Sequence, residues 1–322
     1  MRAIDVVDGK CVLADAPAPA LKPGCVRIAV TAAGINRADL NQKEGRYPPP
    51  PGASLILGLE CAGTIAEVAP DVTSWRVGDR ACALLAGGGY ASEVVVDARH
   101  VLPIPSGMSD VEAAAVVEVF ATAWLNLMDE GGLRYQKGAR LVVHAGGSGV
   151  GTAAVQIARA WGHHPFVTAG DDAKIARCVA LGAEGGANRR AGRWADAASA
   201  WAPGGVDAIL DPVGGAYLAD DLTVLAIDGR LVIIGLMGGR AAEIDLGRLL
   251  VKRLRVVGST LRSRSDDFKA ALVADLRANV WPRFADGTLK PIVDATFPLA
   301  DAEAAHARVA SNGTFGAVVL TV

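Results

Sequence analysis

The feature that most constrains this chain of 322 residues is a glycine cluster between an apolar run and an alanine-rich run. The apolar run is Leu141–Val143, and residues 153–158 continue as a regular helical sequence. The cluster reads Gly146, Gly147, Ser148, Gly149, Val150, Gly151. Glycines in this place allow a sharp strand-to-helix turn and let the backbone approach an anion, toward which the next helix points its free N–H groups. The segment therefore predicts a turn that binds the pyrophosphate of a dinucleotide.

Two registers of the glycine motif fit this segment. A literal G-x-G-x-x-A pattern falls at Gly149, Gly151 and Ala154. A motif that starts at Gly146 and ends at Gly151 instead leaves Ser148 in its middle. Such a motif is weak alone, but it is strong at a strand–helix junction within a series of βαβ units.

From about residue 110 the chain alternates strand-like and helix-like runs. Ser109 lies three residues before Glu112, which is a capping signature that opens an Ala/Val-rich helix. We expect strands at 140–144, 165–168, 206–210, 230–235 and 254–257, and helices at 149–161, 172–181 and 195–202. This alternation predicts βαβ units and a mostly parallel sheet with right-handed crossovers.

Up to about residue 120, short β-branched runs are separated by Gly and Pro. Strands expected at 26–30, 65–68 and 93–96 indicate a compact, mainly β unit. Tyr47 opens a run with four prolines, a stiff loop that either connects elements or forms the rim of a pocket. The last apolar run, 316–320, is expected to return to this unit. The predicted fold class is α/β, with a mainly β unit beside a doubly wound parallel sheet.

Composition narrows the classes of partner. A formal net charge of -2 and an aromatic content of 5% give no basic field and few stacking platforms for nucleic acid. No signal-peptide core is evident, and no stretch approaches the ~18 apolar residues that span a bilayer. The five cysteines have no close pair, which favours free thiols in a reducing compartment. We expect a cytoplasmic protein without membrane or nucleic-acid partners.

The end of the second parallel strand bears on the choice of dinucleotide. An acidic residue there would hold a ribose 2′-OH and favour NAD. The strand instead ends at Gly170, with room for a 2′-phosphate, and Lys174 and the Arg189–Arg190 pair follow. Against this, the Asp171–Asp172 pair would repel that phosphate. We expect NADPH as the cofactor, with NADH possible.

Six segments together resemble a known family. They are 33–40 (AGINRADL), 58–63 (GLECAG), 78–80 (GDR), the glycine cluster with Ser148 at its centre, 235–239 (GLMGG) and 261–264 (LRSR). In these segments the chain resembles the zinc-independent quinone oxidoreductases of the medium-chain dehydrogenase/reductase superfamily, the zeta-crystallin-like group. It is most similar to the p53-inducible quinone oxidoreductase branch, which usually has a Ser in place of Asp171 and a Tyr near Arg189.

The resemblance implies an architecture. A GroES-like catalytic domain would comprise residues 1–121 and 264–322, and a Rossmann nucleotide-binding domain residues 122–263. The cleft between them would hold nicotinamide and substrate, and Rossmann sheet edges would form a homodimer.

The resemblance also implies site residues. Those of the cofactor would be Gly146, Gly147, Ser148, Gly149, Val150 and Gly151 at the pyrophosphate, Gly170, Lys174 and Arg189 near the adenosine ribose, and Thr122, Gly235, Leu236, Met237 and Gly238 near the carboxamide. Asn36, Asp39 and Tyr47 would line the catalytic cleft. Tyr47 is the best candidate proton donor or orienting group, and Asn36 can orient the carbonyl or the nicotinamide ribose.

Zinc-dependent relatives place a Cys near Asn36 and a His-Glu pair where this chain has Leu59 and Glu60. The remaining Glu60 and Cys61 cannot supply the three or four N/S ligands that zinc takes. The five histidines show no metal-binding spacing, so no metal is expected. Without a Lewis acid, a substrate that accepts hydride readily fits best, such as a quinone or conjugated enone.

We therefore expect an NADPH-dependent quinone oxidoreductase that acts on a small molecule by zinc-independent hydride transfer. A 2-alkenal or enone reductase remains open, as does a nucleotide-binding structural or regulatory protein with low turnover. The sequence leaves open the physiological substrate, the proton donor and the choice between dimer and tetramer.

Overall fold

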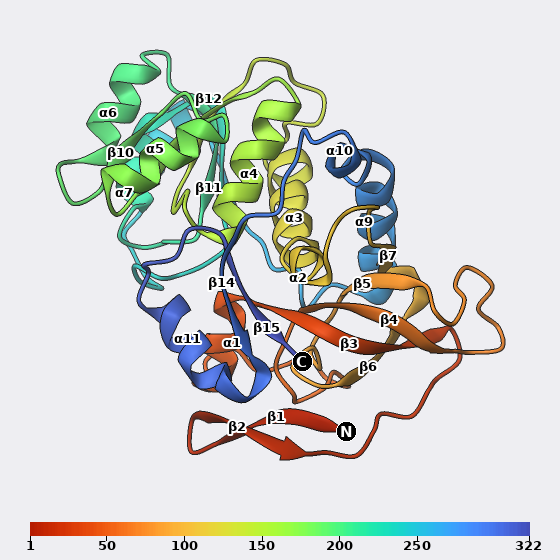
Figure 1. Cartoon of the computed structure of the whole chain (residues 1–322). Helices are drawn as coiled ribbons and strands as arrows, with labels where there is room; N and C mark the ends of the chain where they lie inside the picture. The colour runs from red at the N-terminus through yellow and green to blue at the C-terminus, as the bar shows by residue number, and fades with distance from the viewer. The chain divides into compact units, whose positions relative to one another are not determined.

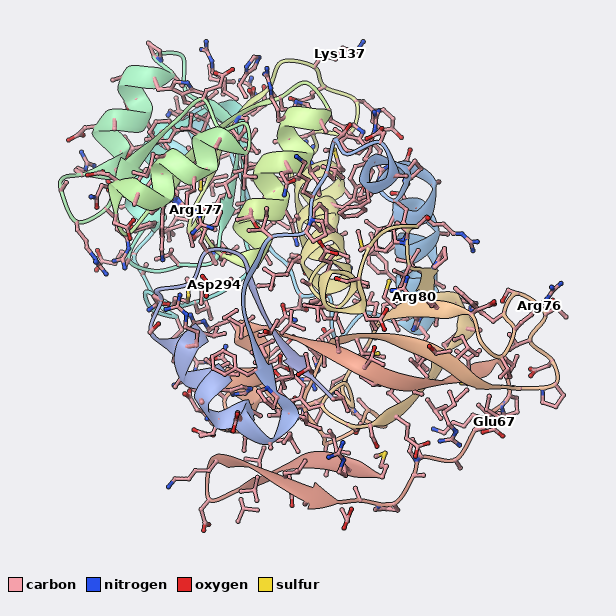
Figure 2. All side chains as sticks on the ribbon, in the orientation of Figure 1. Glu67, Arg76, Arg80, Lys137, Arg177 and Asp294 are labelled. Carbon is pink, nitrogen blue, oxygen red and sulfur yellow. The ribbon has the colours of Figure 1, made fainter.

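The computed structural model describes residues 1–322 and divides into two compact units, drawn in Figure 1. Unit 1 comprises Met1–Ala121 and Leu261–Val322, and unit 2 comprises Thr122–Thr260. The divisions fall after residues 121 and 260, where 121 and 263 were expected. Charged side chains such as Arg76 and Lys137 are exposed and point away from the ribbon (Figure 2).

Unit 1 is built on a seven-stranded sheet in the order β14-β15-β3-β4-β5-β7, in which β6 pairs with β3, together with a separate β1–β2 hairpin. The strands are β1 (Arg2–Val7), β2 (Lys10–Asp15), β3 (Cys25–Ile35), β4 (Glu60–Val68), β5 (Arg80–Leu84), β6 (Glu93–Asp97), β7 (Val101–Pro103), β14 (Val293–Pro298) and β15 (Ala317–Thr321). Because β15 pairs antiparallel with β3, the chain end returns to the first unit as expected.

The helical elements of unit 1, including α3, which continues into unit 2 at Thr122, are mostly short. They are α1 (Arg37–Lys43), η1 (Ala98–His100), α2 (Asp110–Ala113), α3 (Val117–Trp124), α9 (Asp266–Asn279), α10 (Pro282–Ala285), η3 (Leu299–Asp301) and α11 (Ala302–Ala310). Ser109 and Glu112 form the predicted capping box at the start of α2.

One helical segment corrects an expectation from the sequence. Asp110–Glu130 is long and apolar enough, by length and composition alone, to cross a membrane, although no such stretch was expected. Its most apolar window is 83% buried inside the structure, as in the core helix of a globular fold.

Unit 2 is a six-stranded parallel sheet in the order β10-β9-β8-β11-β12-β13. Its strands are β8 (Arg140–Val143), β9 (His164–Ala169), β10 (Gly185–Asn188), β11 (Val206–Asp211), β12 (Leu225–Ile233) and β13 (Arg255–Gly258). Its helices are η2 (Leu125–Glu130), α4 (Gly149–Ala160), α5 (Asp172–Ala180), α6 (Trp194–Trp201), α7 (Leu218–Val224) and α8 (Leu246–Val251). The predicted parallel sheet is therefore confirmed.

The order of this sheet locates a ligand site. From β8 the chain builds outward through β9 and β10, and then returns to place β11 on the other side of β8. Strand order thus reverses between β8 and β11, and open parallel sheets bind ligands at the carboxyl ends of the strands at such a switch point. The glycine cluster lies directly after β8.

Candidate functional site

The glycine turn joins β8 to the amino end of α4. Ala145 adopts a left-handed conformation with φ of 52°, and the Gly146 N–H donates to the Thr168 carbonyl at 2.9 Å. Ser148 caps α4, because its hydroxyl accepts a hydrogen bond from the Gly151 N–H at 3.0 Å. The turn therefore presents the amino end of a 12-residue helix at the sheet's switch point, where an anion is favoured.

Packing explains two of the glycines. A Cβ at Gly146 would lie 2.7 Å from the Cβ of Val167, and one at Gly151 would lie 2.4 Å from the Ala145 carbonyl oxygen. Neither position can hold a side chain unless the turn opens. The need for glycine at residue 146 favours the register that starts there.

The end of β9 brings an arginine beside Gly170. A Cβ at Gly170 would lie 3.7 Å from the Arg190 Cζ, so this guanidinium covers the strand end. Asp171 caps α5, and its Oδ1 accepts a hydrogen bond from the Lys174 N–H at 2.8 Å. Arg189, the arginine singled out from the sequence, instead interacts electrostatically with Tyr217.

The segment 235–238, which we expect near the nicotinamide carboxamide, is hydrogen-bonded to the loop that follows β11. The Gly238 N–H donates to the Val213 carbonyl at 2.7 Å, and the Met237 N–H to the Pro212 carbonyl at 3.2 Å. In return, the Gly215 N–H donates to the Gly239 carbonyl at 2.9 Å. Loops 212–215 and 235–239 therefore form one structural unit. Thr122, expected near the same group, lies in α3 and accepts a hydrogen bond from Asn126 through its carbonyl.

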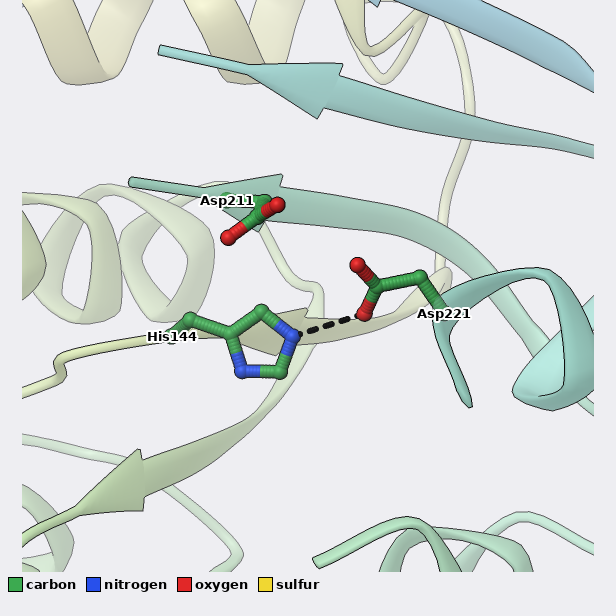
Figure 3. A group of neighbouring side chains, drawn as sticks. All are labelled: His144, Asp211 and Asp221. Carbon is green, nitrogen blue, oxygen red and sulfur yellow. Dashed lines mark hydrogen bonds and ion pairs between the residues drawn. The ribbon is translucent and has the colours of Figure 1, made fainter. Parts of the chain in front are cut away.

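Three buried polar side chains meet under these loops (Figure 3). His144 Nε2 lies 2.8 Å from Asp221 Oδ1, and His144 Nδ1 lies 3.0 Å from the Thr168 hydroxyl. The third member, Asp211, lies at the end of β11. No sequence motif indicated this cluster, because His144 is 67 and 77 residues away from the two aspartates.

The donors of this cluster do not fit a resident metal ion, although their potential ligand atoms lie within 4.8 Å of one another. Both Asp211 oxygens accept backbone hydrogen bonds, from Val213 at 2.6 Å and from Gly214 at 2.9 Å. Both nitrogens of His144 also have protein partners. Within the cluster, Asp221 Oδ2 is the one side-chain oxygen or nitrogen that is buried without a hydrogen-bond partner.

In unit 1, Asn36 is held by a buried glutamate. Its Nδ2 donates to Glu60 Oε1 at 2.9 Å, while Glu60 Oε2 accepts from the Glu118 N–H at 2.9 Å. Burial raises the pKa of Glu60 to about 7. Since one amide proton is engaged, Asn36 can offer its oxygen and its second amide proton to a ligand.

Asp39 is fully buried and engaged with protein donors. Its Oδ2 accepts from the Asn36 N–H at 2.8 Å and the Tyr90 hydroxyl at 3.1 Å, and its Oδ1 accepts from the Gly58 N–H at 3.0 Å. Burial raises the pKa of Asp39 to about 6. This carboxyl group therefore fixes the turn that carries Asn36.

Tyr47 is half-buried beneath an arginine. The Arg262 Cζ lies 5.5 Å from the centre of the Tyr47 ring, within cation–π range. Arg262 also donates to Gln42 Oε1 at 2.6 Å and to the Ala86 carbonyl at 2.8 Å. Sequence reasoning gave no role to Arg262 or Glu60, although both lie in segments that carried the family resemblance.

The positions that correspond to zinc ligands hold a donor set that does not fit the metal. Asn36 offers an amide, Leu59 offers no donor, and Glu60 is engaged by Asn36 and Glu118. Cys61 is fully buried, and that burial raises the pKa of its thiol far above the ordinary value. Zinc takes thiolate, imidazole or free carboxylate ligands.

Comparison with known proteins gives two family matches. The family model described as alcohol dehydrogenase GroES-like domain matches residues 22–106. The family model described as zinc-binding dehydrogenase matches residues 149–276. The predicted combination of a GroES-like and a Rossmann domain is thereby confirmed.

The curated relatives include polyketide synthases, and the similar solved structures include a quinone oxidoreductase and an enoyl reductase. The chain is 33% identical over 304 residues to a mycocerosic acid synthase-like polyketide synthase of Mycobacterium tuberculosis. The alignment covers 93% of this chain and 14% of that protein. The chain spans about one seventh or less of the length of the curated relatives it matches.

Among solved structures, the quinone oxidoreductase of Thermus thermophilus, also known in complex with NADPH, is 34% identical with a TM-score of 0.84, covering 100% of both chains. The CurK enoyl reductase is 27% identical with a TM-score of 0.86, covering 99% of this chain and 98% of that one.

Proposed function

The chain belongs to the medium-chain dehydrogenase/reductase superfamily as a nicotinamide-dependent oxidoreductase, and on this premise we propose that it is an NADPH-dependent quinone oxidoreductase that needs no zinc. The observation that carries the proposal is the donor set at Asn36, Leu59 and Cys61, which does not fit zinc. Without a Lewis acid, the substrate must accept a hydride readily, as a quinone does. The full-length similarity to a quinone oxidoreductase supports this choice.

The nucleotide would be held by unit 2. The turn 146–151 and the amino end of α4 suit the diphosphate, and the segment 235–238 suits the carboxamide. Arg190 beside Gly170 suits a 2′-phosphate, which is our reason for proposing NADPH over NADH. When bound, the reduced nicotinamide supplies a hydride.

We propose that residues of unit 1 act on the acceptor. Negative charge develops on the substrate oxygen as the hydride arrives, and fixed donors stabilise it. The Tyr47 hydroxyl is the proposed donor, since Arg262 holds the ring in place. Asn36, fixed by Glu60, would orient the carbonyl or the ribose. Solvent can supply the final proton.

Reduction of a conjugated enoyl or 2-alkenal substrate is the second candidate. The observation that favours it is the similarity to polyketide synthases and to an enoyl reductase. The chemistry differs only in the acceptor atom, because a hydride adds to the β-carbon of a polarised double bond.

The test uses NADPH that carries deuterium at the transferred position of C4, with tetramethyl-1,4-benzoquinone and 2-alkenals or enoyl thioesters as separate acceptors. For the proposed function we expect rapid NADPH oxidation with the quinone and a hydroquinone free of carbon-bound deuterium. If only the enoyl or alkenal substrate reacts and keeps deuterium on its β-carbon, the second candidate is correct. Nucleotide binding with no acceptor reduced would leave a binding protein of low turnover.

We also propose that the chain forms a homodimer through the β13 edge of unit 2. This strand ends the parallel sheet and leaves one edge unpaired, which in natural proteins is usually covered. Large apolar side chains are exposed on or near it, at Leu250, Val251 and Val256. A second copy of the same edge would bury them around a two-fold axis.

A further inference from the structure

The buried cluster of His144, Asp211 and Asp221 lies at the switch point of the parallel sheet (Figure 3). His144 directly follows β8, and Asp211 ends β11, the two strands between which the order reverses. Asp221 comes from α7. Through His144 the cluster therefore lies just before the glycine turn, and through Asp211 it contacts loop 212–215, which is hydrogen-bonded to the segment 235–239.

Asp211 fixes the loop on the carboxamide side. Its two oxygens accept the N–H groups of Val213 and Gly214, at 2.6 and 2.9 Å. The same loop then receives the N–H groups of Met237 and Gly238 on its carbonyls. One carboxylate thus sets the position of loop 212–215 and, through it, of the segment 235–239.

His144 fixes the start of the glycine turn. Its backbone N–H donates to the Leu210 carbonyl at 3.1 Å, and its ring lies between Thr168 and Asp221. Edge-on contacts to Trp194 and Tyr217, with ring centres 4.5 and 4.8 Å away, complete its surroundings. The ring cannot turn without breaking one of these hydrogen bonds.

This arrangement is costly for folding. All three side chains are buried, and Asp221 Oδ2 has no hydrogen-bond partner. Buried charges of this kind commonly destabilise a fold relative to apolar residues of similar volume. A cluster that costs stability and orders two ligand-binding loops has the properties of a functional device.

We propose that Asp211, supported by the His144–Asp221 pair, is a positioning residue that sets the phosphate turn and the carboxamide segment in register for the bound dinucleotide. The inference rests on the proposed function and deepens it, since it names what organises the nucleotide site. Asp211 itself need not touch the nucleotide.

The protonation state of Asp211 should govern this role. Burial and then the charge of Asp221 raise the pKa of Asp211 to about 6. The titratable and charged groups around the cluster are His144, Asp221, Tyr217, Asp220 and Arg189. Ionised Asp211 accepts both loop N–H groups strongly, whereas the protonated acid is a weaker acceptor. Nucleotide affinity is therefore expected to fall as pH drops through about 6.

The experiment compares Asp211→Asn with wild type by nicotinamide fluorescence titration. NADH is the probe, because the 2′-phosphate of NADPH titrates in the same range. At pH 7.5 we expect the Kd to rise by about tenfold or more in D211N, because the introduced amide nitrogen cannot accept the second N–H group. We expect its Kd to stay level between pH 5.5 and 8, where that of wild type rises at the acid end.

The matched control is Asp207→Asn at the other end of β11. Asp207 also accepts a backbone hydrogen bond, from the Arg140 N–H at 2.8 Å, but lies at the amino edge of the sheet. An equal loss of affinity in D207N, or an unchanged Kd in folded D211N, would overturn the proposal. If D211N does not fold, the wild-type profile decides alone, and a Kd independent of pH would contradict the inference.

The outcomes separate this inference from the proposed function. Normal nucleotide binding with no quinone reduction refutes only the proposed function, because the titrations need no acceptor. Absence of NADH and NADPH binding by wild type would overturn both.

Discussion

Glu60 combines two demands at one buried position. Its oxygens receive the Asn36 amide and the first N–H groups of α3, so the same carboxyl orders a site residue and a helix start. Such a group is useful for positioning, but its charge is costly once it is ionised in an apolar interior. The balance between the two should appear in the pH dependence of stability.

Glu60→Gln is expected to change that dependence. Burial raises the pKa of Glu60 to about 7 from an ordinary 4.5, so its contribution to stability is present at low pH and is lost as pH rises through 7. Glutamine does not ionise, so the variant does not lose stability in this way as the pH rises. Between pH 5 and 8 the free energy of unfolding of E60Q should therefore improve relative to wild type by up to roughly 3 kcal/mol. Urea denaturation at both pH values measures it.

The control is Glu67→Gln on the same strand, where Glu67 is exposed and pairs with Arg27. This change should shift the free energy of unfolding by less than about 1 kcal/mol. A difference between E60Q and wild type that is the same at pH 5 and pH 8 would show that Glu60 is not a strongly raised buried acid.

Arg190 is expected to decide the choice of nucleotide. Its guanidinium lies beside Gly170, where a 2′-phosphate would lie, so Arg190→Ala should raise the Kd of NADPH by about tenfold or more. The Kd of NADH, which lacks that phosphate, should stay within twofold or so of wild type. Fluorescence titration with each nucleotide gives both values.

Arg189→Ala is the matched control, because Arg189 is the exposed neighbour in sequence and carries the same charge. If R189A weakens NADPH binding and R190A does not, the sequence-based choice of Arg189 was the better one. Equal losses for NADPH and NADH in R190A would instead mean that neither arginine reads the 2′-phosphate.

Site residues could be predicted from sequence only where the signal is local. The glycine turn, Asn36 and Tyr47 lie in short motifs, and the structure places a partner beside each of the latter two. The cluster under the turn joins residues from three distant elements, and no spacing could indicate it. Likewise, covering Gly170 with Arg190 depends on how β10 pairs with β9.

Among the elements of unit 2, the β8–α4 junction is closely packed. Its turn is closed by the Ser148 cap and by close contacts at two glycines. Gly151→Ala would place a Cβ 2.4 Å from the Ala145 carbonyl oxygen, so the turn must open. We expect nucleotide binding to weaken by at least about 50-fold and stability to fall by roughly 1–3 kcal/mol.

Gly192→Ala provides the control, because nothing lies within 4 Å of the Cβ it would add. Titration and thermal unfolding of G192A should match wild type. Wild-type affinity in a folded G151A variant would mean that the turn does not need its closed form to hold the nucleotide.

In unit 2 the sequence predicted every strand except β10, and it predicted helices α4, α5 and α6 but not α7 or α8. Short apolar runs separated by helix-like runs predicted β8, β9, β11 and the helices between them. The strand β10 reads Gly-Gly-Ala-Asn, without β-branched residues, and exists because β9 offers it an edge. Helix α8 has no buried residue, so its apolar side chains give no inward-facing stripe. Tertiary context, not propensity, determines both.

At the scale of the whole molecule, the exposed apolar face near β13 predicts association. Leu250 is 78% exposed on α8, a position that stability of the monomer does not require. Leu250→Glu should therefore leave the fold intact but convert a dimer, of twice the 33.0 kDa chain mass, into a monomer. Light scattering coupled to size-exclusion chromatography measures the mass.

Leu55→Glu is the matched control, since Leu55 is 79% exposed in unit 1. It should remain dimeric. A monomeric wild type, or a dimer that L55E disrupts and L250E does not, would contradict association through this edge.

The reaction that we propose for this chain is hydride transfer from bound NADPH to a quinone without the help of zinc. The most direct test is quinone-dependent NADPH oxidation by protein freed of metal with a chelator and checked by elemental analysis. We expect the same rate before and after metal removal, with less than about 0.1 zinc per chain. Activity that disappears with the metal and returns with added zinc would contradict it, as would no oxidation with any quinone.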